Sequence, residues 1–150
     1  MLLSHIVENN YMHAPLLSTL TLIAELFVSA IIYYSFYKGY KHGKFPVRLA
    51  GAAVLYEIIF NISYMASRMG SQTQSKLLPP FVVVFAIVHG TLSLIMFLAL
   101  VVYFTLAWRR YRRGINYFHT HKAPTTVFLF FWTVSILSGI AFYLMDYVLM

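Results

Sequence analysis

Residues 79–108 read PPFVVVFAIVHGTLSLIMFLALVVYFTLAW, a segment without Asp, Glu, Lys or Arg that carries one histidine, His89, in its first half. An α-helix needs about 20 apolar residues to cross a hydrocarbon layer of about 30 Å, and this segment is longer than that. The segments 15–37, 46–67 and 124–149 are also apolar over a length sufficient to span. The sequence therefore predicts an all-α integral membrane protein, a four-helix bundle that forms a single transmembrane domain over residues 1–150.

The composition supports this fold class. The chain is 61% hydrophobic and 10% charged, whereas soluble domains carry about 25% charged residues. Its net charge of +7 is concentrated in two short loops and not on a continuous face, so nucleic acid is not an expected partner. The chain has no cysteine, which excludes disulfides, thiolate metal sites and a cysteine nucleophile. We find no nucleophile elbow, phosphate loop or dinucleotide fingerprint, and we do not expect an enzyme.

The basic residues predict how the bundle is oriented. Most Lys and Arg residues lie in 38–48 and 109–122, while Arg68 and Lys76 are the basic residues between the second and third predicted spans. Lys and Arg concentrate in cytoplasmic loops. We therefore expect a multi-pass protein of the cell inner (plasma) membrane with both termini on the outer side. The lipid bilayer is then its first partner, and the tract Arg109, Arg110, Arg112 and Arg113 is expected to contact anionic lipid or a partner protein.

Each predicted helix has one polar face, because residues three, four or seven apart share a face of an α-helix. The polar faces comprise Ser18, Thr21, Glu25 and Ser29; Glu57, Asn61, Tyr64 and Arg68; His89, Ser93 and Met96; and Trp132, Ser135, Gly139, Tyr143 and Asp146. Four such faces are expected to converge inside the bundle. Arg68 and Asp146 fall near the outer ends of the second and fourth spans, where we expect a structural ion pair.

Glu25, Glu57 and His89 share one depth. Each lies about ten residues, roughly 15 Å, below the outer end of its helix, so the three side chains could meet. Ionisable groups at that depth are costly unless they are paired or functional. Three interpretations follow: a hydrogen-bonded cluster that sets helix register, a metal site of Glu25, Glu57 and His89 for zinc or iron, or haem ligation by His89 or proton relay through the carboxylates.

The last span carries a family resemblance. From His121 the chain reads HKAPTTVFLFFWTVSILSGIAFYLMDY. The spacing of His121, Trp132, Gly139 and the Tyr-Leu-Met run from Tyr143 resembles the last helix of the CtaM-like family of small membrane proteins (domain of unknown function 420). His89 is similar to the histidine of that family's preceding helix. The segment 60–64, FNISY, is similar to its Phe-Leu-x-x-Tyr segment, and 38–40, KGY, to its Gly-Tyr.

The resemblance implies a role in maturing haem–copper terminal oxidases, with His89 and His121 as the residues that hold haem or copper. Two other positions at which the family tends to have histidine are Pro46 and Arg68 in this chain. The cofactor is thus left open, and a protein without one remains an alternative. The sequence-based hypothesis is an accessory protein for oxidase assembly that contacts other membrane proteins of a respiratory complex. A permanent structural or haem-associated subunit of such a complex and a small proton-coupled carrier are the alternatives.

Overall fold

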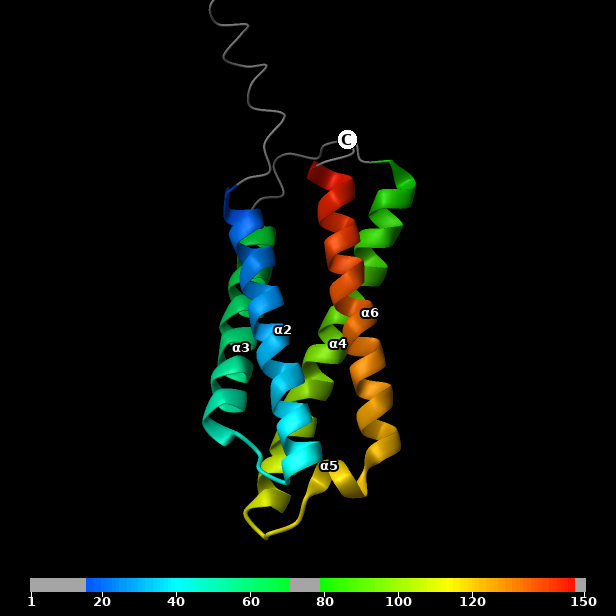
Figure 1. Cartoon of the computed structure of the whole chain (residues 1–150). Coiled ribbons are helices and arrows are strands. Elements are labelled where there is room, and N and C mark those ends of the chain that lie inside the picture. Colours follow the sequence, from blue (N-terminus) through cyan, green and yellow to red (C-terminus); the bar gives the residue numbers. More distant parts are fainter. Residues whose placement is uncertain (1–15, 71–78, 148–150) are drawn as a thin grey trace, which may run out of the picture.

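The computed structural model describes the backbone of residues 16–70 and 79–147 and the side chains of 18–63 and 79–145. These residues form helices and no strand: α2 (Leu16–His42), α3 (Val47–Gly70), α4 (Pro80–Tyr111), the one-turn α5 (Tyr117–Thr120) and α6 (Lys122–Tyr147). The four long helices alternate in direction, so that α2 begins and α6 ends at the same end of the molecule (Figure 1). The described part of the chain is therefore all-helical, as predicted.

Helix boundaries follow the positions of proline and glycine. Pro80 is the first residue of α4, where a missing N–H costs little, and Pro46 directly precedes α3. Gly43 and Gly114, with φ of 64° and 73°, turn the chain after α2 and α4, a conformation that glycine adopts without steric cost. Asn116 then starts α5 by accepting a hydrogen bond from the His119 backbone N–H at 3.2 Å.

The best-packed region is an aromatic cluster at the end of the bundle that carries α5. Phe36 of α2 lies at its centre, with ring centroids of Tyr103, Phe118 and Phe128 each 5.2 Å away. Phe118, the buried residue of α5, is 2% exposed. The short helix therefore closes this end of the bundle by inserting one ring between the long helices.

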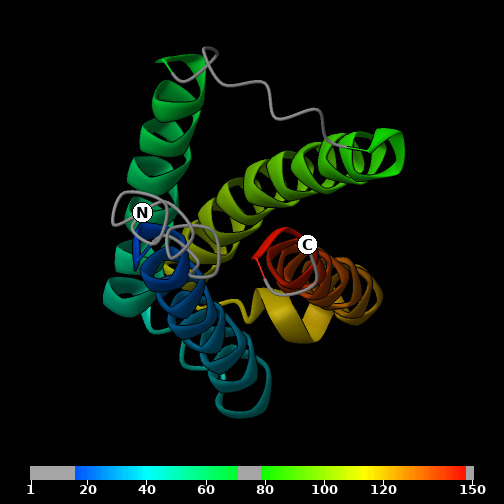
Figure 2. The same ribbon diagram turned by 90° about the horizontal axis from the view of Figure 1, so that it is seen from above.

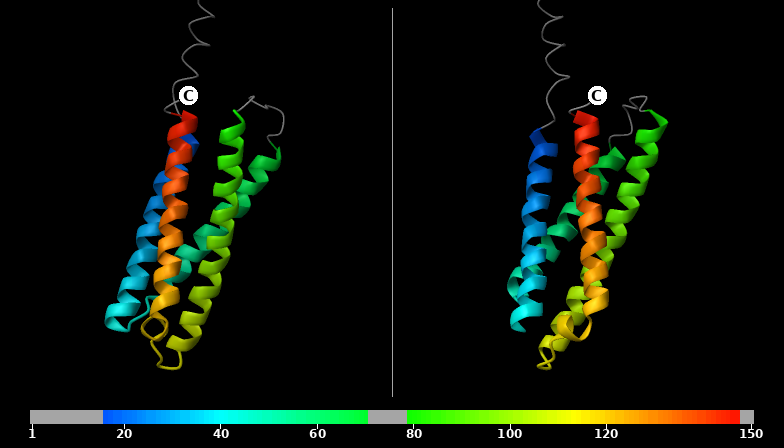
Figure 3. Two further views of the ribbon diagram at one scale, coloured as in Figure 1. Left: turned by 90° about the vertical axis from the view of Figure 1, so that its right-hand side faces the viewer. Right: turned by 45° about the vertical axis from the view of Figure 1, so that its right-hand side comes forward.

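The helices pack as two pairs. α2 packs against α3, and α4 packs along α6. Seen from above, α3 and α4 separate toward the end opposite α5 (Figure 2), and side views show the same up-and-down arrangement (Figure 3). This division into pairs determines which of the predicted polar faces meet.

Three helical segments are long and apolar enough to cross a membrane: Ser18–His42, Pro80–Tyr111 and Lys122–Met145. Large apolar side chains on their outer faces are exposed, for example Phe27 at 67% and Ile87 at 63%, which suits contact with lipid. The predicted second span corresponds to α3, which carries Arg48, Glu57 and Asn61 and is not among these three within its described residues.

Candidate functional site: a carboxyl pair and a mid-helix histidine

Glu25 of α2 and Glu57 of α3 lie across the interface between their helices. Their carboxyl groups are close enough to interact electrostatically, and the Tyr56 hydroxyl interacts with both. Glu57 is 3% exposed. Its Oε2 accepts a 3.3 Å hydrogen bond from Asn61 Nδ2, which also donates to the Glu57 carbonyl oxygen at 2.7 Å. The spacing of four residues between Glu57 and Asn61 is what brings these groups together on one face of α3.

Four buried side-chain atoms of the described residues have no hydrogen-bond partner, and one oxygen of each carboxyl group is among them. They are Glu25 Oε2, Glu57 Oε1, Ser29 Oγ and Trp132 Nε1. A buried carboxylate or hydroxyl without a partner destabilises the fold by the full free energy of its desolvation. Such atoms commonly contact a bound water or ion, so each carboxyl group of the pair keeps one oxygen available for such a contact.

His89 of α4 is held by a different pair of helices. Its Nδ1 lies 2.7 Å from Ser138 Oγ of α6. That hydroxyl donates its single hydrogen to the Ser135 carbonyl oxygen at 2.7 Å, so His89 Nδ1 must be the donor to Ser138. The ring therefore carries its hydrogen on Nδ1 and keeps a lone pair on Nε2, which is the arrangement of a histidine prepared to bind a metal or haem iron.

Gly139 makes room for the His89 ring. A Cβ at position 139 would lie 3.1 Å from His89 Cε1 and 3.5 Å from Nε2. The Phe142 ring stacks on the imidazole with centroids 6.2 Å apart. The absence of a side chain at Gly139 thus lets α4 approach α6 at the histidine.

Further hydroxyl contacts continue along α6. Ser93 and Ser135 are 3.0 Å apart, and the Tyr103 and Thr125 hydroxyls are hydrogen-bonded. Two contacts tie α6 to α2: Thr19 with Tyr143 at 2.7 Å and Tyr33 with Thr133 at 2.5 Å.

Sequence reasoning identified the face that holds Ser135 and Tyr143 but missed Ser138, whose only signal was its place beside Gly139.

The structure does not gather the predicted set of Glu25, Glu57 and His89. Among the described side chains, no three His, Asp or Glu residues are placed to hold a metal ion together. The physical reason is that the residues face different neighbouring helices. Glu25 and Glu57 share the interface of α2 with α3, whereas His89 is hydrogen-bonded to Ser138 of α6. A common depth therefore did not produce a common site.

His121, the other predicted cofactor ligand, lies at the start of α6. Its ring stacks on Tyr117 with centroids 4.2 Å apart, and its Nδ1 is 2.8 Å from Thr120 Oγ1. It precedes Ser138, the partner of His89, by 17 residues, which is roughly 25 Å along a helix. His89 and His121 therefore cannot bind the same cofactor.

The basic tracts meet at the end of the bundle that carries α5, because α2 and α4 both end there (Figure 1). Arg109, Arg110, Arg112 and Arg113 are all exposed. The guanidinium of Arg112 lies 5.8 Å from the Trp108 ring centroid. The predicted ion pair of Arg68 with Asp146 involves side chains outside the described residues.

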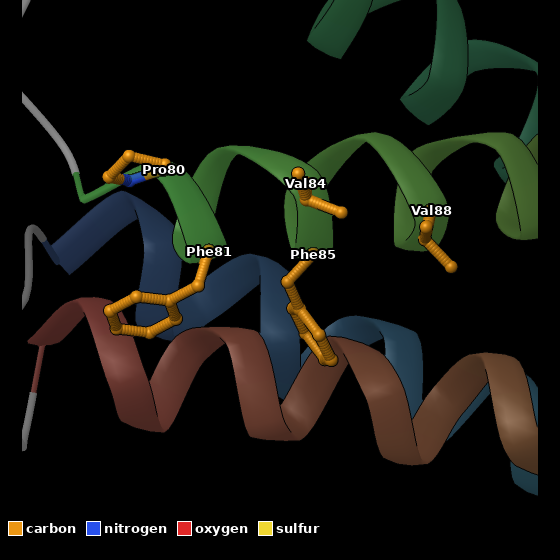
Figure 4. A pocket seen from close by; sticks show the side chains of 5 residues that line it. All are labelled: Pro80, Phe81, Val84, Phe85 and Val88. Carbon is orange, nitrogen blue, oxygen red and sulfur yellow. The ribbon is translucent and has the colours of Figure 1, made fainter.

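A hollow of about 410 Å³ lies on the first turns of α4, at the end away from α5. Its lining is apolar: Pro80, Phe81, Val84, Phe85 and Val88 (Figure 4). The Phe85 side chain points toward α6, where its ring stacks on Phe142. A surface of this kind suits an acyl chain but offers no group for catalysis.

The comparisons with known proteins leave the family open. Protein-family models, curated proteins and solved structures give no match to this chain. The oxidase-related resemblance therefore stays an expectation based on its own residues, and the function is argued from the site.

Proposed function

We propose that this chain is an accessory protein that acts in the assembly or maturation of a haem–copper respiratory oxidase, anchored in the inner (plasma) membrane by four spanning helices. In this proposal α3 is the fourth span beside the three apolar helices. Both termini lie outside, because the exposed basic tracts meet at one end of the bundle and Lys and Arg favour the cytoplasmic side.

The observation that carries this proposal is the tautomer and the fixed orientation of the His89 ring. Ser138 holds the imidazole with hydrogen on Nδ1 and the lone pair on Nε2, while Gly139, which has no side chain, accommodates the Cε1–Nε2 edge of the ring beside α6. A fixed tautomer and orientation is what a ligating histidine requires. Gly139 and Tyr143, which belong to the resemblance, contact His89 and Thr19 respectively, so these motif residues contribute to this interior.

His89 would hold haem iron or copper through one nitrogen, Nε2. Haem is held by axial ligands such as histidine, and His89 supplies one nitrogen. The described residues form no group of three or more His, Asp or Glu side chains that could complete a closed metal site. In this proposal the protein holds a cofactor at one point during transfer and is not a permanent store for it.

The test is deletion of the gene, followed by measurement of oxidase activity and of the haem and copper content of the membranes. We expect activity and cofactor content to fall together and to return with the wild-type gene. Unchanged oxidase activity and content in the deletion strain would refute the proposal. Co-purification with oxidase subunits in fixed stoichiometry would instead assign the chain as a permanent subunit.

A matched pair of variants tests whether His89 itself is required for the proposed function. His89→Ala removes the nitrogen ligand, whereas Ser93→Ala removes a hydroxyl contact from the same α4–α6 interface. Each loses one interhelical hydrogen bond, worth about 0.6 kcal/mol on average in a membrane protein. We expect His89→Ala to fail in restoring oxidase content and Ser93→Ala to restore it. Equal complementation by both, at equal protein level, would remove His89 from the function.

A further inference from the structure

The interface between α2 and α3 has a defined register around the carboxyl pair. The helices are antiparallel, so one turn along α2 from Glu25 corresponds to one turn back along α3 from Glu57. That step leads to Ser29 on α2 and Ala53 on α3, which are 3% and 2% exposed. Ser29 therefore lies in the same buried interface as the two carboxyl groups.

Helix geometry brings the side chains of Ser29 and Glu57 toward the same level of the interface. Side chains lean toward the N-terminus of their own helix, so Ser29 leans toward Glu25 and Glu57 leans toward the level of Ser29. Ala53 is the small, buried side chain of α3 at that level. Glu25 Oε2, Glu57 Oε1 and Ser29 Oγ are all buried and lack hydrogen-bond partners. By contrast Glu57 Oε2 accepts a hydrogen bond from Asn61, so Oε1 is the oxygen of this carboxyl group that is left for a ligand.

The negative charge of the Glu25 and Glu57 carboxylates is not balanced by the described side chains. Along the helices the closest described cations are Arg48, nine residues from Glu57, and Lys38, thirteen residues from Glu25, roughly 14 and 20 Å away. Tyr56 is the titratable neighbour that interacts with both carboxyls, whereas His89 faces Ser138 and Phe142 of α6. Two adjacent carboxylates in a spanning helix pair require a compensating positive charge.

We propose that Glu25, Glu57 and Ser29 form a binding site for one small monovalent cation, a proton or a sodium ion, between α2 and α3. The donors are all oxygen, which disfavours soft transition metals, and three side chains are too few for the six to eight ligands of Ca²⁺. One bound cation removes one of the two negative charges and gives the buried oxygens a partner. This site does not depend on the oxidase role proposed above.

The experiment is infrared difference spectroscopy of the full-length protein in lipid vesicles. The carboxylic acid C=O band is followed in two titrations, one in which the pH is raised and one at fixed pH in which NaCl replaces KCl. A proton site shows a C=O band that disappears as pH rises and is insensitive to sodium. A sodium site shows a band that decreases as sodium is added. In both cases we expect the band to change in Glu25→Gln and Glu57→Gln, which keep the shape of the side chain.

The serine provides a matched comparison. Ser29→Ala removes an unpartnered hydroxyl from the site, while Ser35→Ala removes a buried hydroxyl whose hydrogen bond goes to the Ile31 carbonyl on the same helix. We expect Ser29→Ala to raise the cation concentration at which half of the band change occurs by about threefold to tenfold. Ser35→Ala should leave that concentration unchanged. A wild-type spectrum in which no C=O band responds to pH or sodium would overturn the site. So would a responsive band unchanged in both glutamine variants.

Discussion

Gly39 gives the sharpest test of the packing at the α5 end of the bundle. A Cβ added there would lie 2.5 Å from both Cδ2 and Cε2 of Phe118, a distance that real Cβ contacts do not reach. The ring cannot swing away freely, because its centroid is 5.2 Å from that of Phe36 and 5.4 Å from that of Phe45. Gly39→Ala must therefore displace α5 or the helix that carries the glycine.

The expected magnitude combines opposing effects. Alanine is favoured over glycine inside a helix by about 1 kcal/mol. Overpacking of a filled core costs about 1–3 kcal/mol. Displacement of α5 also weakens the 3.0 Å hydrogen bond from Asn116 Nδ2 to the Gly39 carbonyl oxygen, worth about 0.5–1.5 kcal/mol. We expect Gly39→Ala to lower the free energy of unfolding by about 1–3 kcal/mol, because the steric overlap with Phe118 outweighs the gain in helix propensity.

The assay is denaturation by SDS in mixed micelles, followed by circular dichroism. Gly51→Ala is the matched control, because a Cβ at this exposed glycine of α3 meets nothing within 4 Å. We expect that control to be neutral or stabilising by up to about 1 kcal/mol. Phe118→Leu removes the ring edge, so the double variant with Gly39→Ala should lose less than the sum of the two single changes. Equal effects of Gly39→Ala and Gly51→Ala would refute the packing described here.

Two smaller predictions concern the contacts of α6. Ser138→Ala removes the acceptor for His89 Nδ1, so we expect a loss of about 0.5–1.5 kcal/mol in the same unfolding assay, and a loss as small as measurement error would contradict the bond. Tyr33→Phe removes the hydroxyl that contacts Thr133 and should cost about 0.5–1 kcal/mol. Tyr34→Phe removes a hydroxyl that, among the described residues, accepts an exposed hydrogen bond from Lys38, and it should cost nothing measurable in comparison.

The helical fold could be predicted from the sequence because the apolar segments are long and are separated by proline, glycine and basic residues. α5 could not be predicted, since a helix of 4 residues has no usable periodicity. Its position depends on the insertion of Phe118 beside Gly39, a contact between residues far apart in the chain.

The site was only partly predictable for a related reason. Depth along each helix follows from counting residues, and on that basis the sequence singled out Glu25, Glu57 and His89. The order of helices around the bundle depends on side-chain packing, which counting does not provide. The prediction of one cluster was therefore replaced by a carboxyl pair on α2 and α3 and a histidine bound to Ser138 on α6.

Both proposals place α3 across the membrane, and the absence of cysteine from the chain allows a direct test. Single substitutions Lys44→Cys and Ser71→Cys flank α3 at its two ends. Each variant is treated with a membrane-impermeant maleimide in intact cells and in inverted membrane vesicles. We expect Ser71→Cys to be labelled in intact cells and Lys44→Cys only in inverted vesicles. Labelling of both from the same side would show that α3 does not span, and would contradict the placement of Glu57 in the membrane interior.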